Sequence, residues 1–145
     1  MIGDALYGLT PKELRSQPVM QRAIRQAEVS LAATTVTANL DSVPLELLFH
    51  VTHLNVFCFG GGAQTVTSFR VELQDENGVT IAEVWRSTPD GAAVGQRGDA
   101  KMVDLLLMPR ERLSLSGFFS AGAAVNLVAL DAFGLFVPRG NVQHR

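Results

Sequence analysis

Two long segments of the chain are apolar at both odd and even positions, and this pattern limits the possible folds more than any other. Successive side chains of a β-strand point to opposite faces, so a strand at a sheet surface normally alternates apolar and polar residues. In Leu45–Phe59, one face would carry Leu45, Leu47, Phe49, Val51, Phe57 and Phe59, and the other Leu48, Leu54, Val56 and Cys58. In Ala123–Val137, Val125, Leu127, Phe133, Leu135 and Val137 oppose Val128, Leu130 and Phe136. Such strands need cover on both faces, from the same chain or from a neighbouring one.

The rest of the chain predicts short strands separated by turns. We expect strands at residues 29–38, 43–59, 65–74, 79–85, 101–108, 112–119 and 123–137. Asp75–Gly78 is a typical hairpin turn, with glycine where a left-handed backbone is needed. Residues 86–100 form the longest expected loop. A series of strands without helices between them predicts a mainly β fold, an antiparallel β-sandwich or jelly-roll-like domain.

The first part of the chain has a different pattern. Residues 10–13 resemble a helix start, with a capping threonine, a proline in the first turn and an acid that completes a capping box. Pro18 interrupts this helix, and residues 18–27 place their apolar side chains on one helical face. We therefore expect an N-terminal arm with a short, kinked helix over residues 1–28 and a β-sandwich over residues 29–145.

Composition excludes several classes of function. Charged residues make up 18% of the chain, against about 25% in an average globular protein, so we expect part of the surface to be covered by protein. The net charge is −2 and no polybasic block is present, which argues against binding to nucleic acid. The most apolar window, residues 45–59, contains Glu46, His50 and His53 and is a poor membrane span. The start of the chain shows no secretory pattern, so we expect a soluble protein made in a cytoplasm.

No pattern points to catalysis, a metal or a cofactor, and we expect no enzyme activity. His50 and His53 would lie on opposite faces of an unbroken strand, and the third histidine, His144, is in the tail. The glycines at 60–62 are not followed by Lys-Ser or Lys-Thr, so a flexible hairpin connection is predicted rather than a phosphate-binding loop. The single cysteine, Cys58, is expected to be a small buried apolar residue.

Two residues invite a binding interpretation. Trp85 ends an expected strand beside the long loop, where it could stack on a sugar, although packing at the sheet margin is the commoner use of tryptophan there. Arg97 begins an Arg-Gly-Asp tripeptide, an integrin-type sequence, inside the expected loop. Matches of three residues occur often by chance, and this loop needs glycine and polar residues in any case.

The C-terminal half carries a resemblance to a known class of protein. It rests on residues 106–119 (Leu-Leu-Met-Pro-Arg-Glu-Arg-Leu-Ser-Leu-Ser-Gly-Phe-Phe), 123–130 (Ala-Ala-Val-Asn-Leu-Val-Ala-Leu) and 137–141 (Val-Pro-Arg-Gly-Asn). This stretch resembles the small β-sandwich structural proteins of tailed bacteriophages, especially the head decoration or cement class. The resemblance implies a trimer or dimer that sits on or between capsid subunits and stabilises the shell. Its partners would be other copies and a major capsid or connector protein, in a virion made in the host cytoplasm.

The first hypothesis is therefore a virion structural protein that acts as a capsid decoration or cement protein. The candidate contact residues are Leu6, Tyr7 and Leu9 in the arm, with Trp85 and Arg97 beside the long loop. The alternative is a receptor- or carbohydrate-binding β-sandwich module of a fibre or tail. A third hypothesis, an enzyme on a jelly-roll scaffold, requires clustered histidines and carboxylates.

Overall fold

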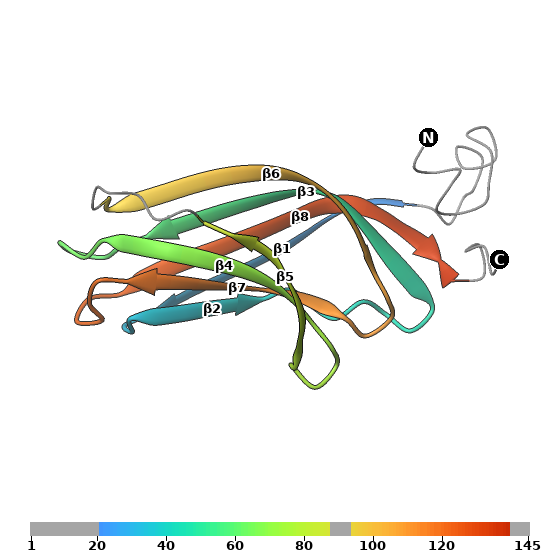
Figure 1. The fold of residues 1–145 in the computed structure, drawn as a ribbon, viewed down its shortest axis with the longest axis horizontal. Helices are drawn as coiled ribbons and strands as arrows, with labels where there is room; N and C mark the ends of the chain where they lie inside the picture. Colours follow the sequence, from blue (N-terminus) through green and yellow to red (C-terminus); the bar gives the residue numbers. More distant parts are fainter. Residues whose placement is uncertain (1–20, 88–93, 140–145) are drawn as a thin grey trace.

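The computed structural model describes residues 21–87 and 94–139, and in these ranges it contains eight β-strands and no α-helix. The strands are β1 (Gln21–Leu31), β2 (Thr35–Asn39), β3 (Leu47–Phe59), β4 (Val66–Gln74), β5 (Thr80–Arg86), β6 (Gln96–Leu107), β7 (Arg112–Phe119) and β8 (Asn126–Pro138). They form two four-stranded antiparallel sheets, sheet A in the order β1-β8-β3-β6 and sheet B in the order β2-β7-β4-β5, packed face to face (Figure 1). The predicted mainly β, antiparallel sandwich is confirmed.

The strand pairing is nested around one turn. β4 pairs with β5, β3 with β6, β2 with β7 and β1 with β8, so the chain runs as one long hairpin that folds back between β4 and β5. Pairing of β3 with β8 and of β4 with β7 completes the two sheets. At the turn, Gly78 has a φ of 79° and the Asp75 carboxylate accepts hydrogen bonds from the amides of Asn77 and Val79. The hairpin predicted from the sequence is confirmed.

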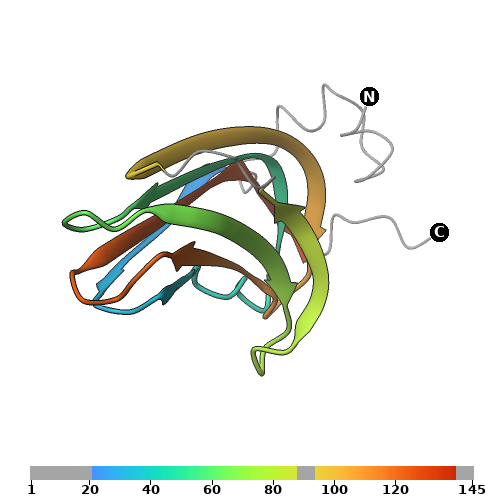
Figure 2. The ribbon, with the colours of Figure 1, turned by 60° about the vertical axis from the view of Figure 1, so that its left-hand side comes forward.

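The core lies between the two sheets, where their inward-facing side chains meet. Its large buried side chains include Phe49, Leu54, Phe69, Leu113, Leu115 and Leu130. Fully burying one side chain of this size contributes about 1.5–3 kcal/mol. β2 shows the alternation in its simplest form, with Val36 and Ala38 buried and the three residues around them exposed. Figure 2 shows both sheets curling around this space. In the part of the chain that is described, no helix is long and apolar enough to span a membrane.

The helix predicted over residues 18–27 is wrong from Gln21 onward, because β1 pairs with β8 along its whole length. Ala23, Ala27 and Val29 pack against the core, while the residues between them alternate with a period of two. Apolar residues four positions apart share a face in a helix and in a strand, so their spacing could not separate the two. The sandwich therefore includes residues 21–28, which the sequence assigned to the arm. The earlier part of the predicted helix lies outside the described residues.

A bulge in β3 changes which residues of the first apolar segment face inward. Val51 pairs with Gly134 and His53 with Phe133, so Thr52 is an extra residue on β3. An extra residue reverses the alternation of side chains. The buried inner side of β3 consists of Phe49 and Val51 before the bulge and of Leu54, Val56 and Cys58 after it. The expectation that one regular alternation makes the whole segment apolar on both faces is therefore wrong.

Three connections also differ from the sequence-based expectation. Residues 32–34 break the expected strand at 29–38 into β1 and β2. β6 begins at Gln96, so the expected loop at 86–100 ends earlier. The glycines at 60–62 lie in a connection from sheet A to sheet B, not in a hairpin, because β3 and β4 belong to different sheets.

Candidate functional site: the two outer faces

Four rows of side chains cross the outer face of sheet A, because the strand register sets residues of β1, β8, β3 and β6 side by side. The rows are Ile24, Phe133, His53 and Met102; Gln26, Asp131, Asn55 and Ala100; Glu28, Ala129, Phe57 and Gly98; and Ser30, Leu127, Phe59 and Gln96. We define the apolar outer face by its large hydrophobic members, which are Ile24, Phe57, Phe59, Met102, Leu127 and Phe133.

The apolar outer face is accessible to solvent. Met102 is 73% exposed, Ile24 57%, Phe59 45% and Phe57 40%. Single exposed hydrophobic residues are common on proteins. Here they fall in two groups, Ile24 with Met102 and Phe57 with Phe59, and the row between the groups contains Gln26, Asp131 and Asn55. We take this face as the candidate interaction surface. A cavity of about 450 Å³ opens at the Ile24 side, lined by Arg22, Ala23, Ile24, Thr52, Phe133, Gly134 and Leu135.

Both histidines of β3 lie on the outer side of sheet A, so the prediction that they face opposite sides is wrong. The bulge at Thr52 lies between them and reverses the alternation. His50 is buried, and its Nε2 lies 2.7 Å from Oδ1 of Asp104. Nε2 of His53 lies 2.8 Å from Oδ1 of Asn55. Within residues 21–87 and 94–139, no three His, Cys, Asp or Glu side chains are grouped as metal ligands.

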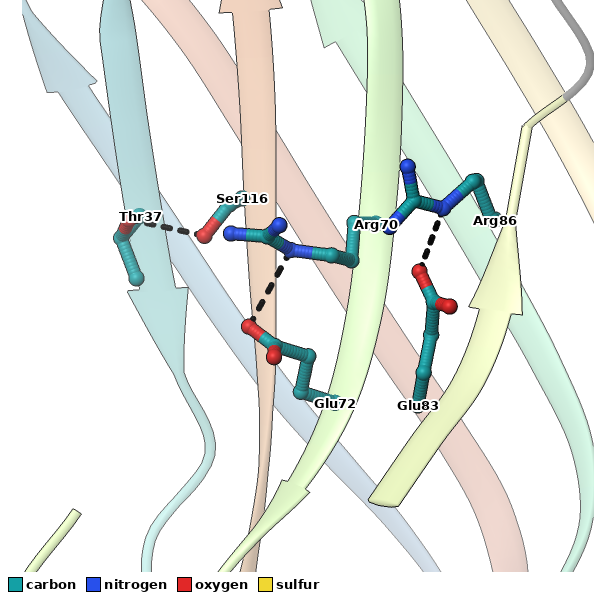
Figure 3. Close-up of polar contacts among 6 residues, drawn as sticks. All are labelled: Thr37, Arg70, Glu72, Glu83, Arg86 and Ser116. Atoms are coloured by element: carbon teal, nitrogen blue, oxygen red, sulfur yellow. Dashed lines mark hydrogen bonds and ion pairs between the residues drawn. The ribbon is translucent and has the colours of Figure 1, made fainter. Parts of the chain in front are cut away.

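The outer face of sheet B is polar. Figure 3 shows its central side chains, which are Thr37, Arg70, Glu72, Glu83, Arg86 and Ser116. Nε of Arg70 lies 3.2 Å from Oε1 of Glu72, and Nε of Arg86 lies 2.6 Å from Oε1 of Glu83. The hydroxyl groups of Thr37 on β2 and Ser116 on β7 are 3.1 Å apart and share a hydrogen bond. We call these six residues the polar outer face.

The polar outer face has its charges paired within itself. Each arginine has a neighbouring glutamate, and the Arg70 guanidinium also lies 5.4 Å from the ring centroid of Phe118. A shallow depression of about 300 Å³ is lined by Ser68, Phe69, Arg70, Arg86, Ser87 and Phe118. Covering paired charges removes their hydration and supplies no new partner, so this face gains little from burial.

Trp85 and Arg97 come together at the open edge of the sandwich, on β5 and β6. The half-buried Trp85 ring stands edge-on to Phe69, with 4.9 Å between ring centroids, and Nζ of Lys101 lies 5.9 Å from the Trp85 centroid. The Arg97 guanidinium lies 5.4 Å from the Phe69 centroid, and its Nε donates a hydrogen bond to Asp99. The Arg-Gly-Asp tripeptide therefore lies within β6 and not in the expected loop. Trp85 and Arg97 both pack on the ring of Phe69.

The remaining residues singled out from the sequence are the three in the arm and Cys58. Leu6, Tyr7 and Leu9 lie outside the described residues. Cys58 is buried between the sheets, and burial raises the pKa of its thiol to about 12, with smaller opposing contributions from the charges of Arg97 and Asp99. A neutral buried thiol is a poor nucleophile, in agreement with the expected packing role.

The apolar outer face was not identified from the sequence as a site. Its signal was present in Phe57 and Phe59, which belong to the first apolar segment and face outward. Ile24 was assigned to a helix, and Met102 stood in a strand whose partner was unknown. The face exists only because the register places β1, β8, β3 and β6 next to one another.

The fold and its surfaces define an eight-stranded, nested antiparallel β-sandwich with one apolar and one polar outer face. No protein-family model matches the chain, and no curated protein matches its sequence. Similar solved structures include a chain of the infectious bursal disease virus particle, with 14% identity and a TM-score of 0.44 over 88% of this chain and 33% of that one. A chain of the cyanophage Pam1 capsid has 11% identity and a TM-score of 0.48 over 84% and 89% of the two chains. An arabinose-bound α-L-arabinofuranosidase has 15% identity and a TM-score of 0.38 over 92% and 25%. The present chain spans about a third of the bursal disease virus chain.

Proposed function

We propose that the protein is a virion structural protein, and specifically a decoration or cement protein that stabilises a capsid shell by subunit contacts. The nested pairing of eight strands in two sheets supports a jelly-roll architecture, which viral capsid domains, lectins and cupins use. Within that set, the resemblance of residues 106–119 and 123–130 to phage decoration proteins favours the virion. The proposed partners are other copies, as a trimer or dimer, and a major capsid or connector protein.

The observation that carries the proposal is the apolar outer face of sheet A. Fully burying one side chain such as Ile24 or Phe57 contributes about 1.5–3 kcal/mol, and the exposed parts of four such side chains contribute on the order of 4 kcal/mol. Association costs about 4–15 kcal/mol in lost translational and rotational freedom. The gain about equals the lowest estimate of this cost, so self-association needs further contacts beside this face. Such a face suits a protein that makes several contacts at once, as a chain seated in a shell does.

Sedimentation of the purified full chain at micromolar concentration tests the proposal. We expect the unchanged chain to self-associate and the double variant Phe57→Ser, Met102→Ser to lose most of that association. Ile81→Ser is the matched control, because Ile81 is 52% exposed but lies on β5 of sheet B. A wild-type chain that stays monomeric and also binds no capsid shell in a co-sedimentation assay contradicts the proposal.

One observation favours a carbohydrate- or receptor-binding module as the second candidate. The depression on sheet B sets the Arg70 and Arg86 guanidinium groups beside the Phe118 ring, and such mixed polar and aromatic surfaces suit sugars and carboxylates. Trp85 is less suited to stack on a sugar, because Phe69 and Lys101 already contact its ring. Binding to a glycan array that disappears in Arg86→Gln and persists in Phe57→Ser favours this candidate over assembly.

A further inference from the structure

The strand β6 forms an edge of sheet A. It is the uppermost strand in Figure 1, and among the described strands it pairs only with β3. Residues 96–104 of this strand are all exposed or half-buried. A long edge strand is a template for pairing with another chain, and main-chain hydrogen bonds supply the affinity in such pairing.

The charges of β6 complement themselves in one register. Asp99 and Lys101 lie on the same face of the strand, because only Ala100 separates them. When two copies of β6 pair antiparallel about a two-fold axis at Ala100, residue 99 of each copy stands opposite residue 101 of the other. An acid and a base then meet twice, with Cβ atoms about 4.5–5.5 Å apart. Moving the axis by one residue sets Asp99 against Asp99 or Lys101 against Lys101, so charge selects this register.

Both side chains have capacity for this contact. Nζ of Lys101 lies 5.9 Å from the centroid of the Trp85 ring, and no carboxylate of the described residues is ion-paired with it. Asp99 accepts a hydrogen bond from Nε of Arg97 at 2.7 Å, and its side chain is 36% exposed. A carboxylate has about four acceptor positions, so Asp99 can accept from a second cation.

The same register joins the apolar groups of two outer faces. Met102 is 73% exposed and would stand opposite Gly98 of the other copy, which leaves space beside Phe57. The φ of Gly98 is not positive, and a Cβ atom there would lie 3.7 Å from Phe57 as its nearest contact, so nothing within the chain requires glycine. The group of Ile24 and Met102 in one copy would therefore continue into the group of Phe57 and Phe59 in the other.

The other edge strands, β1, β2 and β5, lack such a pattern. On β1, a register that sets Arg22 against Glu28 of a second copy also sets Arg25 against Arg25. On β5, the two charged residues pair with each other at 2.6 Å, and β2 carries no charge. On β6, by contrast, Lys101 is left over and meets a carboxylate in a second copy.

We propose that two copies of this chain join edge to edge through β6, antiparallel and centred on Ala100, so that their A sheets form one continuous sheet. The inference rests on the proposed assembly function and names its self-contact. Charged side chains on an edge strand keep unrelated strands away, and the alternating sign on β6 admits a strand of matching pattern, which its own copy supplies. The backbone hydrogen bonds of this edge are the further contacts that the apolar outer face needs.

Charge substitutions in the full chain test the pairing. We expect Lys101→Glu to weaken self-association about tenfold or more in sedimentation, because two acids then face each other twice. Arg110→Glu is the matched control, since it makes the same change in net charge at an exposed turn outside β6, and it should leave association unchanged. Mixing Lys101→Glu with Asp99→Lys should restore association, because each acid then faces a lysine. Circular dichroism should show that all three variants are folded.

A disulfide tests the register. A cysteine at position 100 would face itself across the axis, and directly opposite residues have Cα atoms about 4.5–5.5 Å apart, which a disulfide can span. We expect Ala100→Cys to form a covalent dimer under mild oxidation, at several times the yield of Gln96→Cys. Gln96 is exposed on the same face of β6 but would stand opposite Asp104. The native thiol, Cys58, is buried and does not compete.

Two results overturn the inference while the chain still self-associates. They are association of Lys101→Glu at the wild-type level and equal cross-linking of Ala100→Cys and Gln96→Cys. A wild-type chain that is monomeric at micromolar concentration but binds a capsid shell also overturns it, and that result leaves the proposed function standing. The proposed function is contradicted only if the wild-type chain is monomeric and also binds no shell.

Discussion

The outer faces of the two sheets are built on the same strand arrangement and have opposite surface chemistry. On sheet A, Phe57, Phe59 and Met102 expose large apolar surfaces, whereas on sheet B the arginines are paired with glutamates and the hydroxyl groups with each other. The low charge content of the chain is therefore not spread evenly. Covering the first face releases water from apolar surface around Glu28 and Asp131, and covering the second removes hydration from paired charges without a comparable apolar area. If the proposed assembly forms, we expect the outer face of sheet A to be covered and that of sheet B to remain in water.

The largest expected effect concerns the bulge in β3, where the alternation of inward-facing and outward-facing side chains is reversed. A Cβ atom at Gly134 would lie 2.0 Å from the His50 carbonyl oxygen, and this backbone atom cannot move without disturbing the bulge. We expect Gly134→Ala to destabilise the fold by about 3 kcal/mol or more in urea unfolding. Gly98→Ala in the same sheet is the control, because its nearest contact would be 3.7 Å away, and it should change stability by less than about 0.5 kcal/mol. Equal stability of the two variants would show that the bulge tolerates a side chain.

An intermediate effect concerns the interior that the two sheets share. Burial raises the pKa of the Cys58 thiol from 9.0 to about 12. Above pH 9 the unfolded chain loses this proton and the folded chain keeps it, so the stabilisation present below pH 9 is lost as the pH rises toward 12. Between pH 7 and pH 10, the wild-type chain should lose about 1.4 kcal/mol more stability than Cys58→Ala. Parallel pH profiles of the two proteins would mean that the thiol is accessible to water.

The smallest expected effect concerns the polar outer face. Arg86 and Glu83 are largely exposed, with side-chain exposures of 65% and 40%, and exposed pairs contribute about 0.2–1 kcal/mol. We expect Arg86→Gln to change the free energy of unfolding by less than about 0.5 kcal/mol and to leave self-association unchanged in sedimentation. If Arg86→Gln dissociates the assembly as strongly as the double variant Phe57→Ser, Met102→Ser, both faces are contact surfaces and the contrast between them fails.

Local signals in the sequence predicted local structure well. Asp75–Gly78 specified its turn by its own chemistry, and β7 has the predicted bounds, Arg112–Phe119. Features that depend on distant pairing were missed. The strand β1 was taken for a helix because Ala23 and Ala27 fit both periods, and pairing with β8 decides between them. The bulge at Thr52 depends on where β8 lies, which β3 alone does not indicate.

The candidate site was harder to predict than the fold. Trp85 and Arg97 were chosen by residue type, and both pack at the sandwich edge. The apolar outer face is a collective surface, assembled from strands that are far apart in the sequence. Part of its signal was nevertheless present, as the outward-facing Phe57 and Phe59 in β3.

The nested pairing also determines the order in which the chain can fold. We expect the β4–β5 hairpin to close first, because its strands are neighbours in the sequence, whereas β1 can pair only after β8 has been made. These two strands are separated by roughly 100 residues, which a ribosome adds in about 5–20 s. During that interval β1 is a nascent edge without its partner, and such non-local topologies fold slowly, in milliseconds to seconds. High-level expression should therefore be limited by aggregation of incomplete chains, and slower translation or a holding chaperone should raise the yield.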